Sequence, residues 1–531
     1  MQISDTKTVG ARGLIQRFRQ ILKSDTGMAI TPGLHTFETS PESGGSRRLH
    51  LRVKDNGEGV LFVDVTDVIH LNQAACEIAW MLLNGEGKNQ VVSALKTKYR
   101  GILSEIRQDV ERLDQILAHF KSHLGTCYTC GIGDLMERVP IFSMPVQAPY
   151  KIDVALTYGC NNQCPHCYNE ANRFEMPSLR LKDWDQVFDR IAELGIPHVI
   201  LTGGEATLNP DFVEIVRYAD QKGMIVGLNS NGRYLGHAPF MQSIAEAGLN
   251  HVQVTLGSCD PEVHNAMMGA DSFEQTVRGI QVALESGIHV ITNTTLMQSN
   301  IGQVAEIVDF LYELGIRTFA MNGMIYSGGG YAHPNALPPE KMEALIAYVR
   351  YLADEKGMRF LWYTPTDYCQ LSPLALDVGV KKCNAAEYSI CIEPNGDVLP
   401  CQSYYVSAGN FLSDPWEHIW SSDLFHSFRD REENPQISML PEMCWTCPDL
   451  SICGGGCRIE RDAQNGIRVA DTAGGGCMGC SSYSPAPTNF VELDSIAQAN
   501  WFDDEREWGY VPPASQVSKT RRSTGTTPEY D

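Results

Sequence analysis

The sequence has no long apolar run. No stretch approaches the roughly 18 to 20 consecutive apolar residues that a membrane-spanning helix requires, and the first residues have no segment with the character of a signal peptide. We therefore expect a cytoplasmic protein that does not use a membrane as a partner.

Positive charge is also scarce. The chain has 42 lysine and arginine residues against 64 aspartate and glutamate residues, so its formal net charge at pH 7 is -22. A chain of this charge repels the phosphate backbone, which argues against nucleic acid as a partner. The length of 531 residues predicts about two to four domains. The hydrophobic content of 43% is enough for their cores.

A disulfide framework is absent as well, although the chain has 17 cysteines. Most of them are grouped in the spacings of metal ligands, and no export signal accompanies them. Metal clusters in a reducing compartment therefore explain these cysteines better than disulfides do.

The first cysteine group lacks a fourth member. Cys160, Cys164 and Cys167 form a CxxxCxxC pattern, and Tyr168 follows directly. A structural zinc site and a fully ligated iron–sulfur cluster both take four protein ligands. Three thiols with no fourth nearby therefore suggest a [4Fe–4S] cluster that keeps one iron open for a small molecule. The alternative is a partial zinc site.

Strands and helices alternate between residues 150 and 330. Six short apolar strands separated by helical stretches predict an α/β fold, a partial (β/α)6 TIM barrel. Chemistry in such a barrel lies at the carboxyl ends of the strands. The predicted strands are Ile152–Leu156, His198–Leu201, Ile225–Asn229, Val252–Leu256, Val290–Thr295 and Arg317–Met321.

Candidate binding motifs follow these strands. Gly203 and Gly204 come after the second strand and let the backbone approach a ligand closely, while Glu205 offers an acceptor to an ammonium group. The glycine run at residues 328–330 is not a phosphate-binding loop, because no Lys-Ser or Lys-Thr follows it. We expect it in a loop near the site instead. The candidates on the third to fifth strands are Ser230, Asn231, Thr255 and Asn293.

On these motifs, residues 151–325 resemble the radical S-adenosylmethionine (radical SAM) enzymes. The resemblance implies that Cys160, Cys164 and Cys167 hold the cluster, and that S-adenosyl-L-methionine chelates the open iron. Related enzymes often have Arg-Gly after the fourth strand where this chain has Met268-Gly269, which leaves the partner of the cofactor carboxylate unassigned. For Asn293 the alternative is a buried polar residue that caps its strand. The cofactor-binding candidates are Tyr168, Gly203, Gly204, Glu205, Ser230, Asn231, Thr255 and Asn293.

A second cysteine-rich segment, residues 383–484, follows a bridging segment at residues 331–382. Its spacing resembles the SPASM extension of peptide-modifying radical SAM enzymes, which implies two auxiliary [4Fe–4S] clusters. A pair of zinc knuckles is the alternative. By this resemblance Cys444, Cys447, Cys453 and Cys477 ligate one cluster, and Cys383, Cys401 and Cys457 ligate the other.

The remaining cysteines have open roles. Cys391 can supply the fourth ligand of the cluster at Cys383, or it can be an inward-facing strand residue. Cys480 could substitute for Cys477. Cys127 and Cys130 form a CxxC in the linker at residues 126–149, as plain linker cysteines or as ligands of an unidentified group.

Residues 46–125 have the pattern of a small winged-helix-like α+β domain, with a hairpin around Asn56-Gly57 and three amphipathic helices. The stretch 60–120 resembles the leader-peptide-binding module (RiPP recognition element) of enzymes that modify ribosomally made peptides. The resemblance implies that a precursor peptide adds a strand to the sheet edge; the alternative is a winged-helix domain that only packs on its neighbour. We expect residues 1–45 to be weakly ordered and the tail, 485–531, to be partly ordered around Trp501–Tyr510.

Together these resemblances imply a maturase of a ribosomally synthesised precursor peptide. An electron donor such as flavodoxin or ferredoxin would reduce the barrel cluster, and the bound cofactor would yield a 5′-deoxyadenosyl radical that abstracts hydrogen from the peptide. The auxiliary clusters would accept the remaining electron, which permits a C–C, C–S or C–O crosslink. No general acid or base is assigned, since surface or core roles are expected for the candidates Tyr326, Tyr363 and Asp367.

Two other functions fit parts of the sequence. One is maturation of a folded protein such as a sulfatase, or modification of a tetrapyrrole; the leader-binding module argues against it. The other is a non-catalytic iron–sulfur or zinc protein for electron transfer or scaffolding. The glycine-rich motifs at the strand ends argue against that function.

Overall fold

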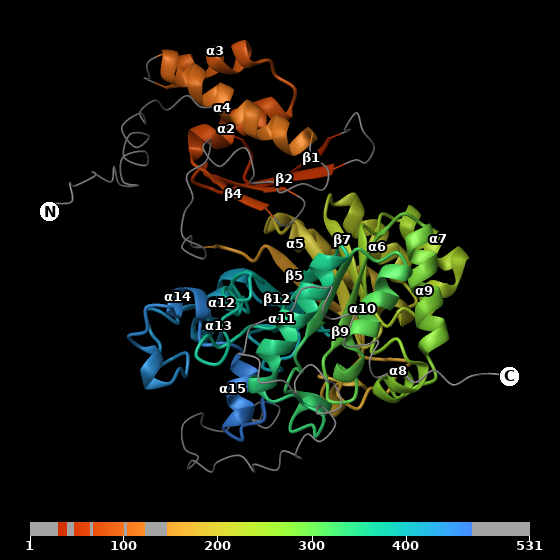
Figure 1. Ribbon diagram of the computed structural model, residues 1–531. Coiled ribbons are helices and arrows are strands. Elements are labelled where there is room, and N and C mark those ends of the chain that lie inside the picture. The colour runs from red at the N-terminus through yellow and green to blue at the C-terminus, as the bar shows by residue number, and fades with distance from the viewer. Residues whose placement is uncertain (1–29, 40–46, 64–66, 100–102, 123–145, 470–531) are drawn as a thin grey trace, which may run out of the picture. The chain divides into compact units, whose positions relative to one another are not determined.

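The computed structural model describes residues 30–39, 47–63, 67–99, 103–122 and 146–469. They form two compact units, one mainly from residues before 141 and the other from the residues that follow (Figure 1). The predictions for Cys127, Cys130, Cys477, Cys480 and the tail lie outside the described residues.

The N-terminal unit contains a four-stranded antiparallel sheet in the order β1-β2-β3-β4. The turn at Asn56-Gly57 is confirmed, because the Gly57 amide donates to the Lys54 carbonyl and Leu51 pairs with Leu61 across the hairpin. The strands are β1 (Gly33–Thr39), β2 (Arg47–Val53), β3 (Gly59–Val63) and β4 (Asp67–Leu71).

The outer strands β1 and β4 extend the predicted hairpin on both sides. β1 lies in the segment that was expected to be weakly ordered, so the prediction for residues 1–45 is wrong at residues 33–39. The sequence of β1 has little apolar content, and the strand exists because it pairs with β2 along its whole length and Phe37 packs on the core. Such pairing depends on tertiary context, which a local pattern does not reveal.

Three helices follow the sheet, as predicted, and lie together on one face of it in Figure 1. Asn72 caps the first of them through its side chain, which accepts a hydrogen bond from the Ala75 amide at 2.9 Å. The apolar stripe of each helix is buried in one core with β2 and β3. The helices are α2 (Gln73–Leu83), α3 (Lys88–Lys98) and α4 (Leu103–Ser122).

The second unit is built on a nine-stranded sheet in the order β11-β10-β9-β8-β7-β6-β5-β12-β13. The six predicted parallel strands are confirmed as neighbours in sequence order, β5 to β10. They are β5 (Lys151–Thr157), β6 (His198–Gly203), β7 (Ile225–Ser230), β8 (His251–Thr255), β9 (His289–Thr295) and β10 (Thr318–Asn322).

Three further strands widen this sheet. β11 (Arg359–Leu361) pairs in parallel with β10, and β12 (Ser389–Ile392) pairs in parallel with β5. β13 (Val398–Leu399) pairs with β12 in antiparallel fashion. The segments predicted as a bridge and a separate cysteine-rich domain therefore each contribute to the barrel sheet, which brings residues near 390 beside the strand that leads into Cys160.

Helices connect the strands of the barrel, as the alternating pattern predicts. Their apolar faces pack on the sheet: Trp184 and Phe188 of the first are fully buried. None of the helices in the described residues is both long and apolar enough to cross a membrane. The barrel helices are α5 (Leu181–Glu193), α6 (Phe212–Gln221), α7 (Ala238–Glu246), α8 (Pro261–Met268), α9 (Phe273–Glu285), α10 (Val304–Glu313) and α11 (Pro339–Glu355).

The cysteine-rich segment is mostly irregular. Its short helices lie between the predicted ligand groups, and three consecutive glycines, 454–456, each adopt a positive φ that lets the chain turn tightly after Cys453. The helices are α12 (Trp416–Trp420), α13 (Asp423–Arg429), α14 (Leu450–Cys453) and α15 (Arg458–Gln464).

Candidate functional site

The loop after β5 carries the first cysteine group. Burial and the neighbouring thiolates of Cys167 and Cys160 raise the pKa of the Cys164 thiol to about 12. The three thiols are therefore close enough to repel one another when ionised. A cationic metal centre would relieve this repulsion, because a coordinated thiol is deprotonated. The donor set on this loop, hereafter the cluster loop (residues 158–170), fits an iron–sulfur cluster.

A single-metal site would require close convergence of the three thiols. In a tetrahedral zinc site the sulfurs lie about 3.8 Å apart, since each Zn–S bond is about 2.3 Å. Within the described ranges, no three His, Cys, Asp or Glu side chains converge in a way that could hold one metal ion. A cluster places each thiolate on a different iron.

Glycines on other loops hold the cluster loop by its backbone. A Cβ added at Gly328 would lie 2.6 Å from the Cys167 carbonyl oxygen, and one at Gly329 would lie 2.3 Å from the Pro165 carbonyl oxygen. The Gly329 amide also donates to the Cys167 carbonyl at 2.8 Å. The glycine run therefore lies beside the site, as expected, and contacts the cluster loop through its backbone.

The Met268-Gly269 pair, where relatives often have Arg-Gly, has a similar role. The Gln163 amide donates to the Met268 carbonyl at 3.0 Å. A Cβ at Gly269, whose φ is 61°, would lie 2.1 Å from the Gln163 carbonyl oxygen. This pair supports the cluster loop and offers no cation to a carboxylate.

Glu170 fixes the end of the cluster loop. Its buried carboxylate accepts hydrogen bonds from the Gly328 amide at 2.9 Å and the Ser327 hydroxyl at 3.3 Å. The same carboxylate forms an ion pair with Arg468, at 2.6 Å. Three segments far apart in the sequence thus meet at one side chain.

Asn169 connects the loop to the second glycine motif. Its Nδ2 donates to the Gly203 carbonyl at 3.3 Å, and its Oδ1 accepts a hydrogen bond from the Tyr405 hydroxyl at 2.8 Å. A Cβ at Gly203 would lie 2.0 Å from the Thr157 carbonyl oxygen, and one at Gly204 would lie 2.4 Å from the Tyr158 carbonyl oxygen. The missing side chains of these two glycines thus leave room for the neighbouring backbone, in the way that they could leave room for a ligand.

Glu205 is buried at the end of β6. Its Oε1 accepts hydrogen bonds from Thr207 and from the Ser230 hydroxyl, the latter at 2.9 Å, and its Oε2 accepts one from the Asn231 amide at 2.8 Å. Its charge raises the pKa of Cys160, after the larger effect of burial. The carboxylate thus lies near the cluster loop, where Oε2 can accept a further donor such as an amine.

Asn231 and Arg233 join the end of β7 to the cluster loop. The Asn231 side chain donates to Asn161 Oδ1 at 2.6 Å. Arg233 donates to the Asn161 carbonyl and to Asn162 Oδ1. Arg233 was not selected from the sequence, although its place directly after Ser230-Asn231-Gly232 is a signal for it.

Polar side chains continue along the carboxyl ends of β8, β9 and β10. Thr255 pairs in register with Asn293, and Asn293 Oδ1 accepts a hydrogen bond from Asn322 Nδ2 at 2.6 Å. Asn322 also accepts one from the Tyr363 amide at 2.7 Å. The sequence analysis missed Asn322. Its position at the end of the sixth strand, next to the strand that carries Asn293, is a signal for it.

Tyr168 points toward the barrel strands. Burial raises the pKa of its hydroxyl, with further contributions from Cys167, Cys391 and Asp153, whereas a hydrogen bond with Thr202 lowers it. The hydroxyl is therefore placed at the end of β6. Its predicted contact with the cofactor stays a prediction.

The auxiliary cysteines influence one another electrostatically. Burial and Cys383 raise the pKa of Cys401 to about 12, and burial followed by Cys383 raises that of Cys457. Burial, Asp367, Cys453 and Cys447 raise the pKa of Cys444. The ligand assignments themselves stay predictions.

Burial raises the pKa of the Cys391 thiol, and Asp153, Glu393 and Cys401 add to this effect. It is fully buried on β12, in an apolar cluster with Ala155, Tyr158, Leu399 and Tyr405. This is the environment of an inward-facing strand residue, the second of the two roles considered for it, and it does not favour the prediction that Cys391 is a metal ligand.

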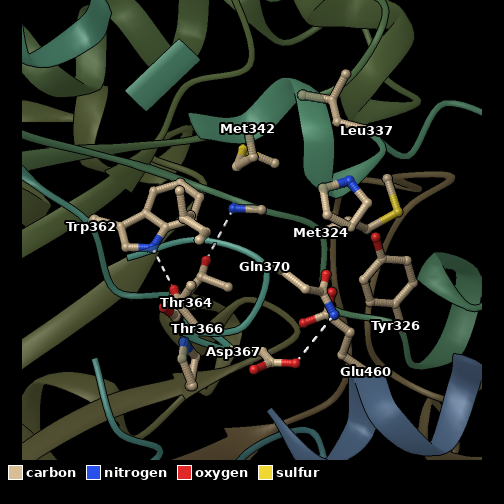
Figure 2. A pocket seen from close by; sticks show the side chains of 14 residues that line it. Met324, Tyr326, Leu337, Met342, Trp362, Thr364, Thr366, Asp367, Gln370 and Glu460 are labelled. Carbon is tan, nitrogen blue, oxygen red and sulfur yellow. Dashed lines mark hydrogen bonds between the residues drawn. The ribbon is translucent and has the colours of Figure 1, made fainter. Parts of the chain in front are cut away.

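A cavity lies between the segments that follow β10 and β11 and the helix α15 (Figure 2). It encloses about 530 Å³, including space that is open to solvent. Met324 and Tyr326 line it after β10, Trp362 and Asp367 line it after β11, and Glu460 lines it from α15. Tyr326 and Asp367, which the sequence analysis named without a role, thus face the same space.

Residues of the cavity lining are related to a cysteine of the cluster loop, Cys164, and to an auxiliary cysteine, Cys457. Met324 packs in a cluster with Met267, Met268 and Cys164 of the cluster loop. Glu460 raises the pKa of Cys457, and the pKa of Glu460 itself is raised to about 7 by burial and by Asp367. A molecule in this cavity would lie within reach of both systems.

Comparison with known proteins agrees with this geometry. The Radical SAM superfamily model matches residues 154–311, and the SPASM model, an iron–sulfur cluster-binding domain, matches residues 383–448. The chain carries a radical SAM domain followed by a SPASM domain. These two domains agree with the enzyme class and the cofactor set of the sequence analysis: S-adenosylmethionine, a barrel [4Fe–4S] cluster and auxiliary [4Fe–4S] clusters.

Curated relatives match about three fifths of the chain. A PqqA peptide cyclase from Streptomyces rochei is 27% identical over 338 residues, which covers 61% of this chain and 88% of the cyclase. An AdoMet-dependent heme synthase from Methanosarcina barkeri is 26% identical over 337 residues, covering 60% of this chain and 94% of the synthase.

Among solved structures, Streptococcus suis SuiB bound to its precursor peptide SuiA matches with a TM-score of 0.55 and 17% identity, covering 77% of this chain and 94% of SuiB. SuiB bound to S-adenosylmethionine matches with a TM-score of 0.53 and 17% identity, covering 78% of this chain and 95% of SuiB. These likenesses show that the fold is shared.

Proposed function

We propose that this protein is a radical SAM/SPASM maturase that installs an oxidative C–C, C–S or C–O crosslink in a ribosomally synthesised precursor peptide. The observation that carries the proposal is the cavity. Its lining residue Met324 belongs to the apolar cluster on which Cys164 packs, and its lining residue Thr366 accepts a hydrogen bond from Cys453. A substrate there can lose hydrogen on one side and an electron on the other.

The residues of the chain have distinct tasks in this proposal. Cys160, Cys164 and Cys167 hold the cluster, and Glu205 Oε2 accepts the amine of the cofactor. When bound, S-adenosylmethionine at a reduced cluster supplies the radical that abstracts hydrogen. Trp362 and the methionine side chains around Met324 give the cavity an apolar wall, which would shield a bound substrate radical from water on that side.

The N-terminal unit supports a peptide substrate. Its sheet has two outer strands, β1 and β4, and each pairs with only one neighbour among the described strands. An unpaired strand edge can take an extended peptide by main-chain hydrogen bonds. The PqqA peptide cyclase and the SuiB complex with SuiA are relatives whose names state a peptide substrate or partner.

The electron supply and the location follow from the cluster chemistry. The described cysteines are all free thiols, as cluster ligands must be before assembly. We place the protein in the cytoplasm, where such thiols stay reduced. A flavodoxin or a ferredoxin is the proposed donor of the electron that reduces the barrel cluster.

The proposal is tested with anaerobically reconstituted, reduced protein and S-adenosylmethionine. We expect 5′-deoxyadenosine above background, and none from a triple Cys160→Ala, Cys164→Ala, Cys167→Ala variant. A short peptide encoded beside the gene should lose the mass of two hydrogen atoms per crosslink. Turnover of a folded sulfatase or of a tetrapyrrole, with no change in such a peptide, would contradict the proposed substrate.

A further inference from the structure

Arg233 contacts the cluster loop directly after its first cysteine. Its Nη1 donates to the Asn161 carbonyl and, at 3.0 Å, to Asn162 Oδ1. Its Nε donates to Gln275 Oε1 of α9 at 2.6 Å. A planar guanidinium holds several acceptors in fixed directions, which an ammonium group does not. Arg233 therefore joins α9 to the two residues that follow Cys160.

Asn162 extends this contact to the sulfur of Cys160. The Asn162 amide donates to Cys160 Sγ at 3.4 Å. The same residue thus bonds the sulfur through its main chain and Arg233 through its side chain. Asn162 is buried, with 7% of its surface exposed, so loss of Arg233 would leave a buried oxygen without this donor. The direction of the amide that faces the sulfur therefore depends on Arg233.

The base from which Arg233 reaches the loop is itself fixed. The Arg233 amide donates to Asn231 Oδ1 at 3.1 Å, and the Asn231 carbonyl accepts a hydrogen bond from the Thr276 hydroxyl of α9 at 2.9 Å. Asn231 Nδ2 donates to Asn161 Oδ1 at 2.6 Å. Both residues after the first cysteine are therefore held from the end of β7.

The position at which relatives often have arginine gives this chain no charge beside the loop. There the Met268 carbonyl accepts a hydrogen bond from the Gln163 amide. Among the contacts described for residues 161–163, Arg233 supplies the one cationic donor. The order of this stretch therefore rests on Arg233 more than the spacing of the cysteines indicates.

Hydrogen bonds to the sulfurs of an iron–sulfur cluster stabilise its more negative, reduced state and so raise its reduction potential. We propose that Arg233 is a positioning residue that holds the Asn162 amide on the Cys160 sulfur and thereby raises the reduction potential of the barrel cluster. It acts through residues 161 and 162. The inference requires the barrel cluster, and it goes beyond the proposed function because it does not depend on the substrate.

The reduction potential of the barrel cluster in the reconstituted full chain tests the proposal. Electron paramagnetic resonance spectra are recorded at a series of fixed potentials. The signal that changes when S-adenosylmethionine is added belongs to the barrel cluster, because the cofactor binds its open iron. At the wild-type midpoint, Arg233→Gln should have about a tenfold lower ratio of reduced to oxidised barrel cluster, a fall of about 59 mV for one electron. An unchanged potential would overturn the proposal.

Two further variants separate position from charge. Arg233→Lys keeps the positive charge but cannot hold Gln275 and both loop acceptors at once, so the potential should fall as it does in Arg233→Gln. A wild-type potential in Arg233→Lys would make charge alone the cause and refute the positioning role. Arg278→Gln, at an exposed position of α9, removes the same charge and should leave the potential unchanged.

A double-mutant cycle tests the route through Asn162. Asn162→Ala removes the side-chain acceptor and keeps the main-chain amide. If Arg233 acts through this residue, the potential of Arg233→Gln, Asn162→Ala should fall by less than the sum of the two single shifts. Strictly additive shifts would refute the route.

Gln275→Ala is the milder variant should Arg233→Gln lose the barrel cluster. It removes the exposed outer acceptor of Arg233, so the potential should fall by less than in the arginine variants, with wild-type iron content; a wild-type potential here would count against the proposal. An unchanged potential in all variants, with a precursor peptide that loses two hydrogen atoms, refutes this inference alone. A lowered potential with an unmodified peptide refutes the proposed function alone.

Discussion

The hydroxyl of Tyr405 donates a hydrogen bond to Oδ1 of Asn169, at 2.8 Å. Asn169 follows Cys167 on the cluster loop, and Tyr405 follows Cys401 in the SPASM segment. Because Asn169 also donates to the Gly203 carbonyl, the segment that is predicted to bind the cofactor is held in place from the SPASM segment. The auxiliary region therefore has a structural task in addition to its electronic one.

Tyr405→Phe removes this hydroxyl and leaves Asn169 Oδ1 buried without its donor. We expect a loss of about 1–2 kcal/mol in the free energy of unfolding and weaker binding of S-adenosylmethionine, because Asn169 also positions Gly203. Anaerobic urea unfolding and equilibrium dialysis of the cofactor measure the two effects. Tyr404→Phe is the matched control, since Tyr404 packs on Phe428. Equal effects of the two variants would disprove the role given to the bond.

Glu170→Gln replaces the carboxylate that joins Arg468 to the Gly328 amide. The neutral side chain keeps an acceptor but loses the ion pair, so we expect a cost of about 1–2 kcal/mol, since Arg468 is partly exposed. The cluster loop should also release iron faster to a chelator. Glu175→Gln, in the exposed part of the same segment, should leave the release rate unchanged. An unchanged rate in Glu170→Gln would show that the ion pair does not hold the loop.

Gly329→Ala places a methyl group 2.3 Å from the Pro165 carbonyl oxygen. The cluster loop must then move, at a cost of about 1–3 kcal/mol, and we expect lower occupancy of the barrel cluster, measured as iron per chain in a variant without auxiliary cysteines. Gly302→Ala is the control, because nothing lies within 4 Å of a Cβ there. Full occupancy of the barrel cluster in Gly329→Ala would show that the cluster loop tolerates a methyl group at this position.

His264 of α8 should make stability depend on pH. Burial lowers the pKa of its imidazole to about 4. The Gly257 amide donates a hydrogen bond to Nδ1 at 3.2 Å, so Nδ1 must carry no proton. Because the pKa in the folded protein lies below the ordinary value of 6.5, protonation favours the unfolded chain. The folded state therefore keeps its full stability above pH 6.5 and loses stability as the pH falls toward 4. At pH 5 the loss is about 2 kcal/mol.

The check on His264 is the pH dependence of the anaerobic unfolding midpoint between pH 7 and pH 5. In His264→Gln this dependence should be shallower than in the wild type, although the variant is less stable at pH 7. His418→Gln, at an exposed position on α12, should keep the wild-type dependence. Parallel curves for His264→Gln and the wild type would rule out the imidazole as the cause.

Local patterns in the sequence were sufficient for much of the site. The spacing of Cys160, Cys164 and Cys167 identified the cluster loop, and the period of apolar residues placed the six strands from β5 to β10. These features are decided by residues close together in the chain, because a strand's alternation and a ligand spacing are both short-range properties. The predicted polar candidates at the strand ends followed from the same reasoning.

The tertiary structure decided what depends on distant segments. Pairing with β2 creates β1, and pairing with β5 buries Cys391. Hydrogen bonds bring the Tyr368 amide and the Thr366 carbonyl to the side chain of Cys453. The sequence by itself determined which chemistry the chain can hold, whereas the three-dimensional contacts determined which side chains share a site. The physical reason is that hydrogen bonds and close packing act across space, where separation along the chain carries no information about distance.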